Sequence, residues 1–215
     1  MPTRATWIFD LDNTLHNASP HIFPHLNRSM TAYLQEHLQL TEEEAGKLRA
    51  HYWRSYGATL LGLMRHHGTD PEHFLRETHA FVDLASMLVF ERGLAAMLRR
   101  LPGRKLVFSN APGHYVGAVL RLMGIDDLFT AVHSIESCAY QPKPTLAAFR
   151  SLLREHDLLA ARCIMVEDTR ANLRSAKRLG MKTVWVTREP RAPAYVDIKT
   201  ASVLALPRLL GHLGL

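Results

Sequence analysis

The stretch Ile8-Phe-Asp-Leu-Asp-Asn-Thr-Leu15 carries an apolar, strand-like run directly into two carboxylates that are spaced by one residue. Two like charges this close repel each other, and such a pair is tolerated where a cation binds or where water solvates both. The simple alternative is an acidic loop in which Asp12 or Asn13 begins a helix. If the strand is central to an α/β sheet, Asp10 lies at the carboxyl edge, where such sheets open their ligand crevice. There we expect one oxygen of Asp10 to bind Mg²⁺ and the other to attack an electrophile.

Further apolar runs along the chain have the same strand-like character. They are bounded by polar or turn-forming residues and do not alternate polar with apolar, as expected when helices cover both faces of a parallel sheet. The predicted strands are residues 6–9, 105–108, 163–166 and 183–186. Helical patterns lie between them at residues 93–100, 115–123, 144–153 and 170–179. Pro144 is expected at a first helical position and Gly180 just past a helix end. The alternation predicts a doubly wound α/β fold.

Residues 19–92 break this alternation, because helical patterns follow one another there with no strand-like run between them. Thr41 and Glu44 form the pattern of a capping box, and Asp70-Pro71 marks another helix start. We therefore predict an all-helical insertion at residues 19–92, after the first strand, and an α/β core domain at residues 1–18 and 93–215.

Polar groups follow two more predicted strands. Ser109 and Asn110 end the second strand, where a hydroxyl, an amide and main-chain N–H groups suit phosphate oxygens, although an ordinary turn has the same composition. Glu167 and Asp168 end the third strand, where they either cap the next helix or complete a Mg²⁺ site with Asp10.

One lysine is set apart from the other basic residues by its neighbours. In Gln141-Pro-Lys-Pro144 two prolines fix the backbone around Lys143, which favours a positioned cation over a solvated loop lysine.

Taken in order, these groups resemble the motifs of the haloacid dehalogenase-like (HAD) hydrolase superfamily. Asp10-Leu-Asp-Asn-Thr14 is similar to its first motif, Ser109 to its second, Lys143 to its third and Glu167-Asp168 to its fourth. The resemblance covers nearly the whole chain. A carboxylate often found a few residues beyond the fourth motif is replaced by Asn172 or lost.

The resemblance implies a phosphatase that works through an aspartyl-phosphate. It assigns Asp10 as nucleophile and Asp12 as the acid and base, with Mg²⁺ held by Asp10, the main-chain carbonyl of Asp12 and Asp168. Lys143 offsets the negative charge of nucleophile and phosphate. In supporting roles, Ser109 and Asn110 hold phosphate oxygens, Thr14 supports the loop, and Glu167 orients metal-bound water or Lys143.

The insertion resembles the cap that closes over the site in this superfamily. More narrowly, Tyr56-Gly-Ala-Thr-Leu-Leu-Gly-Leu63 and Asn13-Thr-Leu-His-Asn17 resemble the pyrimidine 5′-nucleotidase group. The resemblance implies that substrate is selected by side chains of Asn17, Tyr52, Arg54 and Tyr56. Tyr52 and Tyr56 are four residues apart, so packing between cap helices is the alternative for them.

Composition limits the partners. Twenty-six basic against 20 acidic residues give a net charge of +6, yet no basic run interleaved with aromatics appears. Arg170, Arg174 and Arg178 form a helical stripe that a solvated face explains, so we expect no nucleic acid partner. The two cysteines form no CxxC pair, no long apolar run appears, and the N-terminal residues lack a signal-peptide pattern. We expect no membrane partner and a cytoplasmic location.

Several functions are compatible with these sequence features. The leading one is a Mg²⁺-dependent phosphomonoesterase acting on a nucleoside 5′-monophosphate, UMP or CMP first. Rivals with the same core are a phosphatase for a sugar phosphate or phosphoglycolate, and a phosphomutase. A non-catalytic binding protein on the same fold is a different class, against which the intact set of Asp10, Asp12, Lys143 and Asp168 argues.

Overall fold

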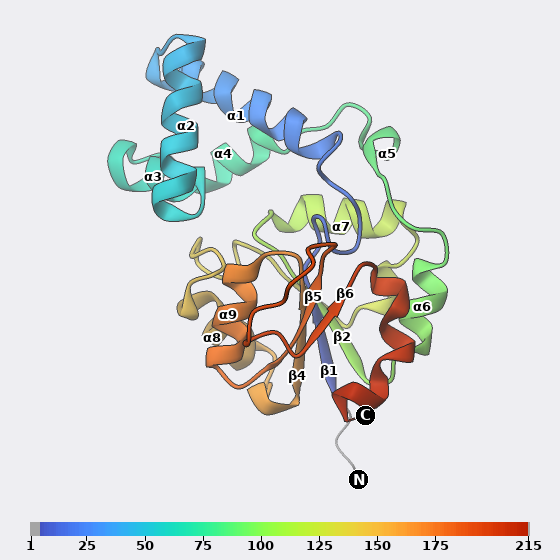
Figure 1. Ribbon diagram of the computed structural model, residues 1–215. Coiled ribbons are helices and arrows are strands. Elements are labelled where there is room, and N and C mark those ends of the chain that lie inside the picture. Colours follow the sequence, from blue (N-terminus) through green and yellow to red (C-terminus); the bar gives the residue numbers. More distant parts are fainter. Residues whose placement is uncertain (1–4, 215) are drawn as a thin grey trace.

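A parallel sheet occupies the centre of the computed structural model, which describes residues 5–214, so the outermost residues of the predicted core domain, 1–4 and 215, lie outside it (Figure 1). The strand order is β3-β2-β1-β4-β5-β6, and every neighbouring pair runs parallel. The strands are β1 (Thr6–Phe9), β2 (Arg104–Phe108), β3 (Ala131–His133), β4 (Cys163–Glu167), β5 (Lys182–Val186) and β6 (Ile198–Thr200). The predicted doubly wound α/β fold is confirmed.

The winding reverses at β1, because the chain first adds β2 and β3 on one side and then β4, β5 and β6 on the other. In open α/β sheets, ligands bind beyond the carboxyl ends of the strands at such a switch point. The residue that follows β1 is Asp10, so the topology places this carboxylate at the expected crevice.

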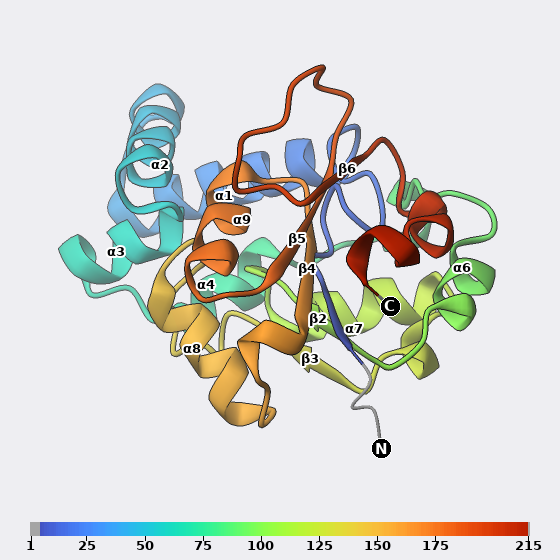
Figure 2. The same ribbon diagram turned by 60° about the horizontal axis from the view of Figure 1, so that its bottom comes forward.

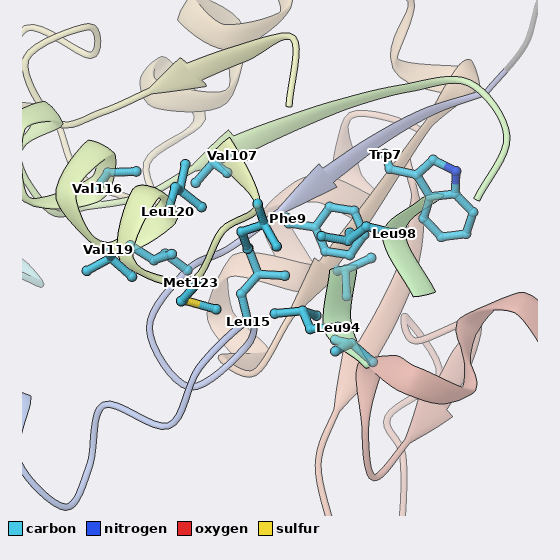
Figure 3. Packing of buried hydrophobic residues seen from close by; sticks show 14 of the residues in the cluster. Trp7, Phe9, Leu15, Leu94, Leu98, Val107, Val116, Val119, Leu120 and Met123 are labelled. Atoms are coloured by element: carbon cyan, nitrogen blue, oxygen red, sulfur yellow. The ribbon is translucent and has the colours of Figure 1, made fainter. Parts of the chain in front are cut away.

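Helices cover both faces of the sheet (Figure 2). One face packs on α6 (Leu94–Arg100), α7 (Gly113–Leu122) and the 3-10 segment Val203–Arg208, and the other on α8 (Leu146–Glu155) and α9 (Arg170–Arg178). Neighbouring residues of β1 alternate between the two cores. Trp7 and Phe9 pack with Leu98 and Val107 on the first face (Figure 3), whereas Ile8 joins Phe149 on the second.

The described residues contain three further short 3-10 segments. They are Asp126–Leu128, Ala160–Arg162 and Leu210–Leu213.

Two strands, β3 and β6, were not among the predicted ones. Each has three residues, Ala-Val-His in β3 and Ile-Lys-Thr in β6, and they form the two edges of the sheet. An edge strand is covered less completely than a central one, so its sequence lacks the continuous apolar run that marks the others.

The predicted helix start at Pro144 is wrong. The helix α8 begins at Leu146, and Thr145 is its N-cap, with a side-chain oxygen that accepts a hydrogen bond from the main-chain N–H of Ala148 at 3.4 Å. Pro144 precedes the cap, and its carbonyl accepts a hydrogen bond from Ser175 at 2.6 Å. Gly180 has a φ of +91°, as expected just past a helix end.

The insertion is helical, as predicted. It contains α1 (Ile22–Leu38), α2 (Glu42–Tyr56), α3 (Thr59–His67), α4 (Pro71–Thr78) and α5 (Leu84–Met87). The capping box of Thr41 and Glu44 is present, and Asp70 caps α4 with Pro71 in its first turn. The helices α1–α4 form a bundle around an apolar cluster that Ile135, from the segment after β3, also joins, while α5 packs against α7 of the sheet unit (Figure 1).

Arg170, Arg174 and Arg178 lie on the exposed face of α9. Among residues 5–214, no helix combines the length and the apolar character that crossing a bilayer requires.

Candidate active site

A tight loop after β1 places Asp10 and Asp12. The main-chain N–H of Asp10 donates to the carbonyl of Val166 in β4 at 3.0 Å, which continues the sheet by one residue. The loop then turns through Asn13, whose φ of +62° is a conformation that asparagine tolerates better than most residues. The side-chain oxygen of Asn13 accepts from the main-chain N–H of Ala18 at 3.0 Å. Thr14 closes the loop on Asp10, because its hydroxyl donates to Oδ2 at 3.1 Å.

Lys143 lies at the centre of the site and is 2% exposed. Its Nζ donates to Oδ1 of Asp10 at 2.7 Å, to the carbonyl of Phe108 at 2.7 Å and to Oε2 of Glu167 at 2.9 Å. An ammonium group has three protons, so each is used. The prediction that this lysine is a positioned cation agrees with its geometry.

Asn110 fixes the backbone that carries this lysine. Its side-chain oxygen accepts from the main-chain N–H of Lys143 at 2.7 Å, and its Nδ2 donates to the carbonyl of the same residue at 3.0 Å. The amide group predicted to hold phosphate is therefore bound to the Lys143 peptide groups. Ser109, which is 2% exposed, lies beside it with its Oγ accepting from the N–H of Ala111 at 3.1 Å.

Glu167 and Asp168, at the end of β4, have different surroundings. Oε2 of Glu167 accepts from Lys143 and, at 3.0 Å, from Nδ2 of Asn172, while Oε1 accepts from the N–H of Thr169 at 3.1 Å. Glu167 thus contacts Lys143 directly, and Asn172 is one of the groups that hold it. Asp168 is half-buried and lines the cavity described below.

The charges of this cluster do not cancel. Asp10, Glu167 and Asp168 each have an oxygen within 4.8 Å of the others, and the ammonium group of Lys143 contacts two of these carboxylates, Asp10 and Glu167. Burial, followed by the charge of Glu167, raises the pKa of Asp10 to about 7 even though Lys143 opposes the shift. Burial also raises the pKa of Glu167 to about 7. Two uncompensated negative charges and oxygen ligands fit a divalent cation such as Mg²⁺.

Asp12 is held by two side chains that the sequence analysis did not identify. Its Oδ1 accepts from the hydroxyl of Tyr115 at 2.8 Å and lies 2.9 Å from Nε2 of His16. Tyr115 is buried on α7, stacked on Phe81 with ring centroids 5.4 Å apart. His16 is four residues from Asp12, a spacing that offered a signal, but Tyr115 lies 103 residues away and offered none.

A cavity of about 660 Å³ opens over this cluster and extends to the insertion. Its floor contains the side chains of Asp10, Asp12, Ser109, Lys143 and Asp168. The insertion supplies much of the rest of the lining from α1–α4, including Phe23, Met30, Arg49, Trp53 and Arg54 of α1 and α2.

Of the four residues predicted to select substrate, one lines the cavity and three do not. Arg54 lines the cavity, whereas Tyr52 is 5% exposed inside the insertion, with its hydroxyl 2.8 Å from Nε2 of His67. Tyr56 also packs within the insertion, and its hydroxyl is 2.6 Å from Nε2 of His66. Asn17 accepts a hydrogen bond from Ser19 and, like the two tyrosines, is not among the residues that line the cavity. Packing, the alternative considered for the tyrosines, matches these positions.

Close packing against Tyr52 explains the second glycine of the Tyr-Gly-x-x-Leu-x-Gly-Leu pattern, which is Gly62. A Cβ atom at this position of α3 would overlap the ring of Tyr52 on α2. We therefore expect Gly62→Ala to destabilise the protein by about 1–3 kcal/mol, the usual cost of overpacking a core, measured by urea unfolding. Gly46→Ala is the matched control, since a Cβ there meets nothing within 4 Å. It should stabilise α2 by about 0.5–1 kcal/mol through helix propensity. Equal effects of the two changes would contradict this account of the pattern.

Comparison with known proteins gives concordant findings. The family model described as "Haloacid dehalogenase-like hydrolase" matches residues 7–186. The chain is 26% identical over 200 residues to Phosphate metabolism protein 8 of Saccharomyces cerevisiae; the match covers 84% of this chain and 60% of that protein's length. It is 29% identical to a Phosphoglycolate phosphatase of Rhodospirillum rubrum, covering 86% of this chain and 82% of that one.

A solved structure has the same fold. The HAD phosphatase from Thermococcus onnurineus superimposes with a TM-score of 0.70 at 19% identity, over 98% of this chain and 99% of the other.

Proposed function

Because this chain belongs to the haloacid dehalogenase-like hydrolase family, we propose that it is a Mg²⁺-dependent phosphomonoesterase that forms an aspartyl-phosphate on Asp10. One observation carries the proposal. Asp10 is fixed through both of its oxygens, by Lys143 and Thr14, and it lies within reach of Asp168 on the floor of a cavity. A carboxylate oriented in this way meets the geometric need of a nucleophile.

The other residues of the site bind the cation and the phosphate group. Asp10, the main-chain carbonyl of Asp12 and Asp168 would hold the cation, while Glu167 is committed to Lys143. A bound Mg²⁺ ion neutralises charge on the transferring phosphoryl group and favours the ionised form of Asp10. The hydroxyl of Ser109 and the main-chain N–H of Asn110 bind phosphate oxygens. Asn110 has a second role, since its side chain keeps the Lys143 backbone in place.

Asp12 acts as the general acid and then as the general base. With Oδ1 held by Tyr115 and His16, its Oδ2 can protonate the departing alkoxide and later accept a proton from the attacking water. Burial, followed by the charge of Asp12, raises the pKa of Tyr115, so its hydroxyl stays a donor across the working pH range. Tyr115 is a positioning residue in this scheme.

Tyr115→Phe should therefore lower kcat/KM for an alkyl phosphate about 10-fold, the equivalent of one hydrogen bond to a charged group. For p-nitrophenyl phosphate the loss should be smaller, because p-nitrophenolate leaves without being protonated. Steady-state kinetics on both substrates provide the measurement. Since kcat/KM reports the steps up to phosphoryl transfer, the difference isolates departure of the leaving group.

Tyr195→Phe is the control for this change, because Tyr195 packs with the α8–α9 core, away from the cavity. It should leave both substrates unaffected. An equal loss on the two substrates in Tyr115→Phe would show that Tyr115 supports the fold and does not orient the acid.

For the leaving group, a nucleoside 5′-monophosphate is the substrate class we propose first. Cavities of about 300–1,000 Å³ take ligands of that size, and 660 Å³ exceeds what a two-carbon acid fills. Trp53 lines the wall with 63% of its surface exposed, so its ring is open to stacking on a base. Arg49 lines the same wall, and its buried Nε has no hydrogen-bond partner in the described structure, so an acceptor on the substrate would satisfy it.

Phosphoglycolate or a sugar phosphate is the second candidate. It is favoured by the likeness to proteins named Phosphoglycolate phosphatase and by Arg49 and Arg54, which can bind a carboxylate. In both cases we propose that residues 19–92 act as a cap that supplies specificity. A phosphomutase is a further candidate, because it uses the same core chemistry.

Phosphate release from a substrate panel tests the proposal. UMP, CMP, AMP, phosphoglycolate and a hexose phosphate should be compared in Mg²⁺ and after chelation by EDTA. We expect turnover that requires Mg²⁺, with the pyrimidine nucleotides first. No release from any ester would leave the non-catalytic binding protein as the better hypothesis, and a large excess of phosphoglycolate turnover over UMP and CMP would exclude nucleotide specificity.

A further inference from the structure

A second group of metal-ligating side chains lies at one edge of the sheet. His133 is the last residue of β3, Glu155 ends α8, and His156 is the C-cap of that helix. One potential ligand atom from each lies within 4.8 Å of the other two. None of the three lines the cavity, so the group is separate from the active site proposed above.

His133 is buried in an unusual way. It is 0% exposed, and within the described structure neither of its ring nitrogens has a hydrogen-bond partner. Nε2 of His156 is buried without a partner as well. Buried polar groups are nearly always paired, and an unpaired one costs about 1–3 kcal/mol. A neutral imidazole has a lone pair to give to a metal ion.

The spacing suits a small divalent cation. Nδ1 of His133 lies 3.3 Å from Oε2 of Glu155, but the two atoms do not have the geometry of a hydrogen bond. Two ligands at about 2.1 Å from a tetrahedral Zn²⁺ ion are separated by about 3.4 Å, which is nearly the same distance. The side chain of Glu155 is 47% exposed, which gives an ion a route from solvent and leaves room for a water ligand.

We propose that His133, Glu155 and His156 bind a late divalent transition metal of the Zn²⁺ class. Two imidazoles and one carboxylate favour such an ion over Mg²⁺, which prefers oxygen ligands. The ion would satisfy the nitrogen of His133 that faces Glu155. It would also join β3, a three-residue edge strand, to the end of α8, and so stabilise this edge of the sheet.

Co²⁺ is the probe, because four-coordinate Co²⁺ absorbs visible light far more strongly than the six-coordinate ion. The full chain is stripped of metal and titrated with Co²⁺ in excess Mg²⁺, which occupies the oxygen ligands of Asp10 and Asp168. We expect one equivalent of intensely absorbing Co²⁺ that Zn²⁺ displaces, and a Zn²⁺-dependent rise in Tm. Glu155→Gln and His156→Gln should each weaken binding about 100-fold or more.

Both of these changes are at partly exposed positions, so they do not carry the folding risk of altering His133. His212→Gln, at an exposed histidine in the last 3-10 segment, is the control and should bind like the wild type. Absence of the strong absorption in the wild type, or its persistence in Glu155→Gln and His156→Gln, would overturn the proposal. Because the readout is binding, failure here is distinct from failure of the proposed phosphatase activity.

Discussion

Asp10→Asn should remove phosphate release almost completely, with a fall in kcat of about 10⁴-fold or more, the size seen when a nucleophile is lost. An amide oxygen does not form the acyl phosphate that we propose, and within the described residues no second carboxylate is fixed between Lys143 and Thr14. Steady-state release from the best substrate of the panel gives the loss. Mass spectrometry of acid-quenched protein should show the phosphorylated species in the wild type only.

The same change should not weaken the fold. Burial raises the pKa of Asp10 to about 7, which means that its ionised form is costly in the folded state. A neutral amide removes that cost, so Tm in metal-free buffer should be equal or higher. Asp127→Asn, at an exposed position, serves as the control and should retain full activity. More than about 1% residual turnover in a folded Asp10→Asn protein would remove Asp10 from the role of nucleophile.

Lys143→Met should impair both activity and stability. Methionine has a similar length but no proton to donate, so Asp10, Glu167 and the carbonyl of Phe108 all lose a partner. Breaking a buried ion pair by removing one member costs about 3–5 kcal/mol. Loss of a preorganised positive charge at the phosphoryl group should lower kcat by about 10²–10³-fold. Urea unfolding and phosphate release measure the two effects.

The loss of stability should depend on pH. Lys143 lowers the pKa values of Asp10 and Glu167, so its removal raises both above their present values of about 7. An acid whose pKa is raised by folding contributes full stability below its unfolded pKa and loses it as pH rises toward the folded value. In metal-free buffer, Lys143→Met should therefore recover stability between pH 8 and pH 5.

Lys105→Met is the matched control, because this partly buried lysine contacts the carbonyl of Gly103 and has no carboxylate partner among its described contacts. Its effect on stability should be small at both pH values. An unchanged deficit of Lys143→Met at pH 5 would indicate lost packing rather than unpaired charge.

The sequence alone predicted the central part of the sheet well. The strands β1, β2, β4 and β5 are buried on both faces, and burial on both faces requires the continuous apolar runs by which they were recognised. The edge strands β3 and β6 carry no such requirement, and they were missed. The grouping of Asp10 with Glu167 and Asp168 followed from strand ends, since the carboxyl ends of parallel strands meet at one edge. Lys143 follows no predicted strand, and the resemblance to the superfamily motifs added it to the group.

Other parts of the site depend on contacts that no local pattern encodes. The hydrogen bond from Tyr115 to Asp12 joins residues 103 positions apart, and the tyrosine sits in an ordinary amphipathic helix. Asn110 was expected to face the substrate, but its amide meets the Lys143 peptide groups 33 residues later. The spacing of Tyr52 and Tyr56 fits either base stacking or helix packing. The close approach of Gly62 to Tyr52, which this spacing does not reveal, favours packing.

The reversal of winding at β1 has a consequence for biosynthesis. The strand β1 leaves the ribosome before its two partners. Its pairing with β2 can form first, but its other edge pairs with β4, residue for residue from Thr6–Cys163 to Phe9–Val166. Until the residues of β4 have been made, the central strand has a bare edge, and Lys143 has no Glu167 to face. Pairings so distant in sequence form slowly, and exposed edges invite misassembly. A nascent chain of this protein therefore lacks the complete Asp10–Lys143–Glu167 cluster and is vulnerable until β4 emerges. Codon changes or chaperone depletion that act before this point should lower the yield of folded protein most.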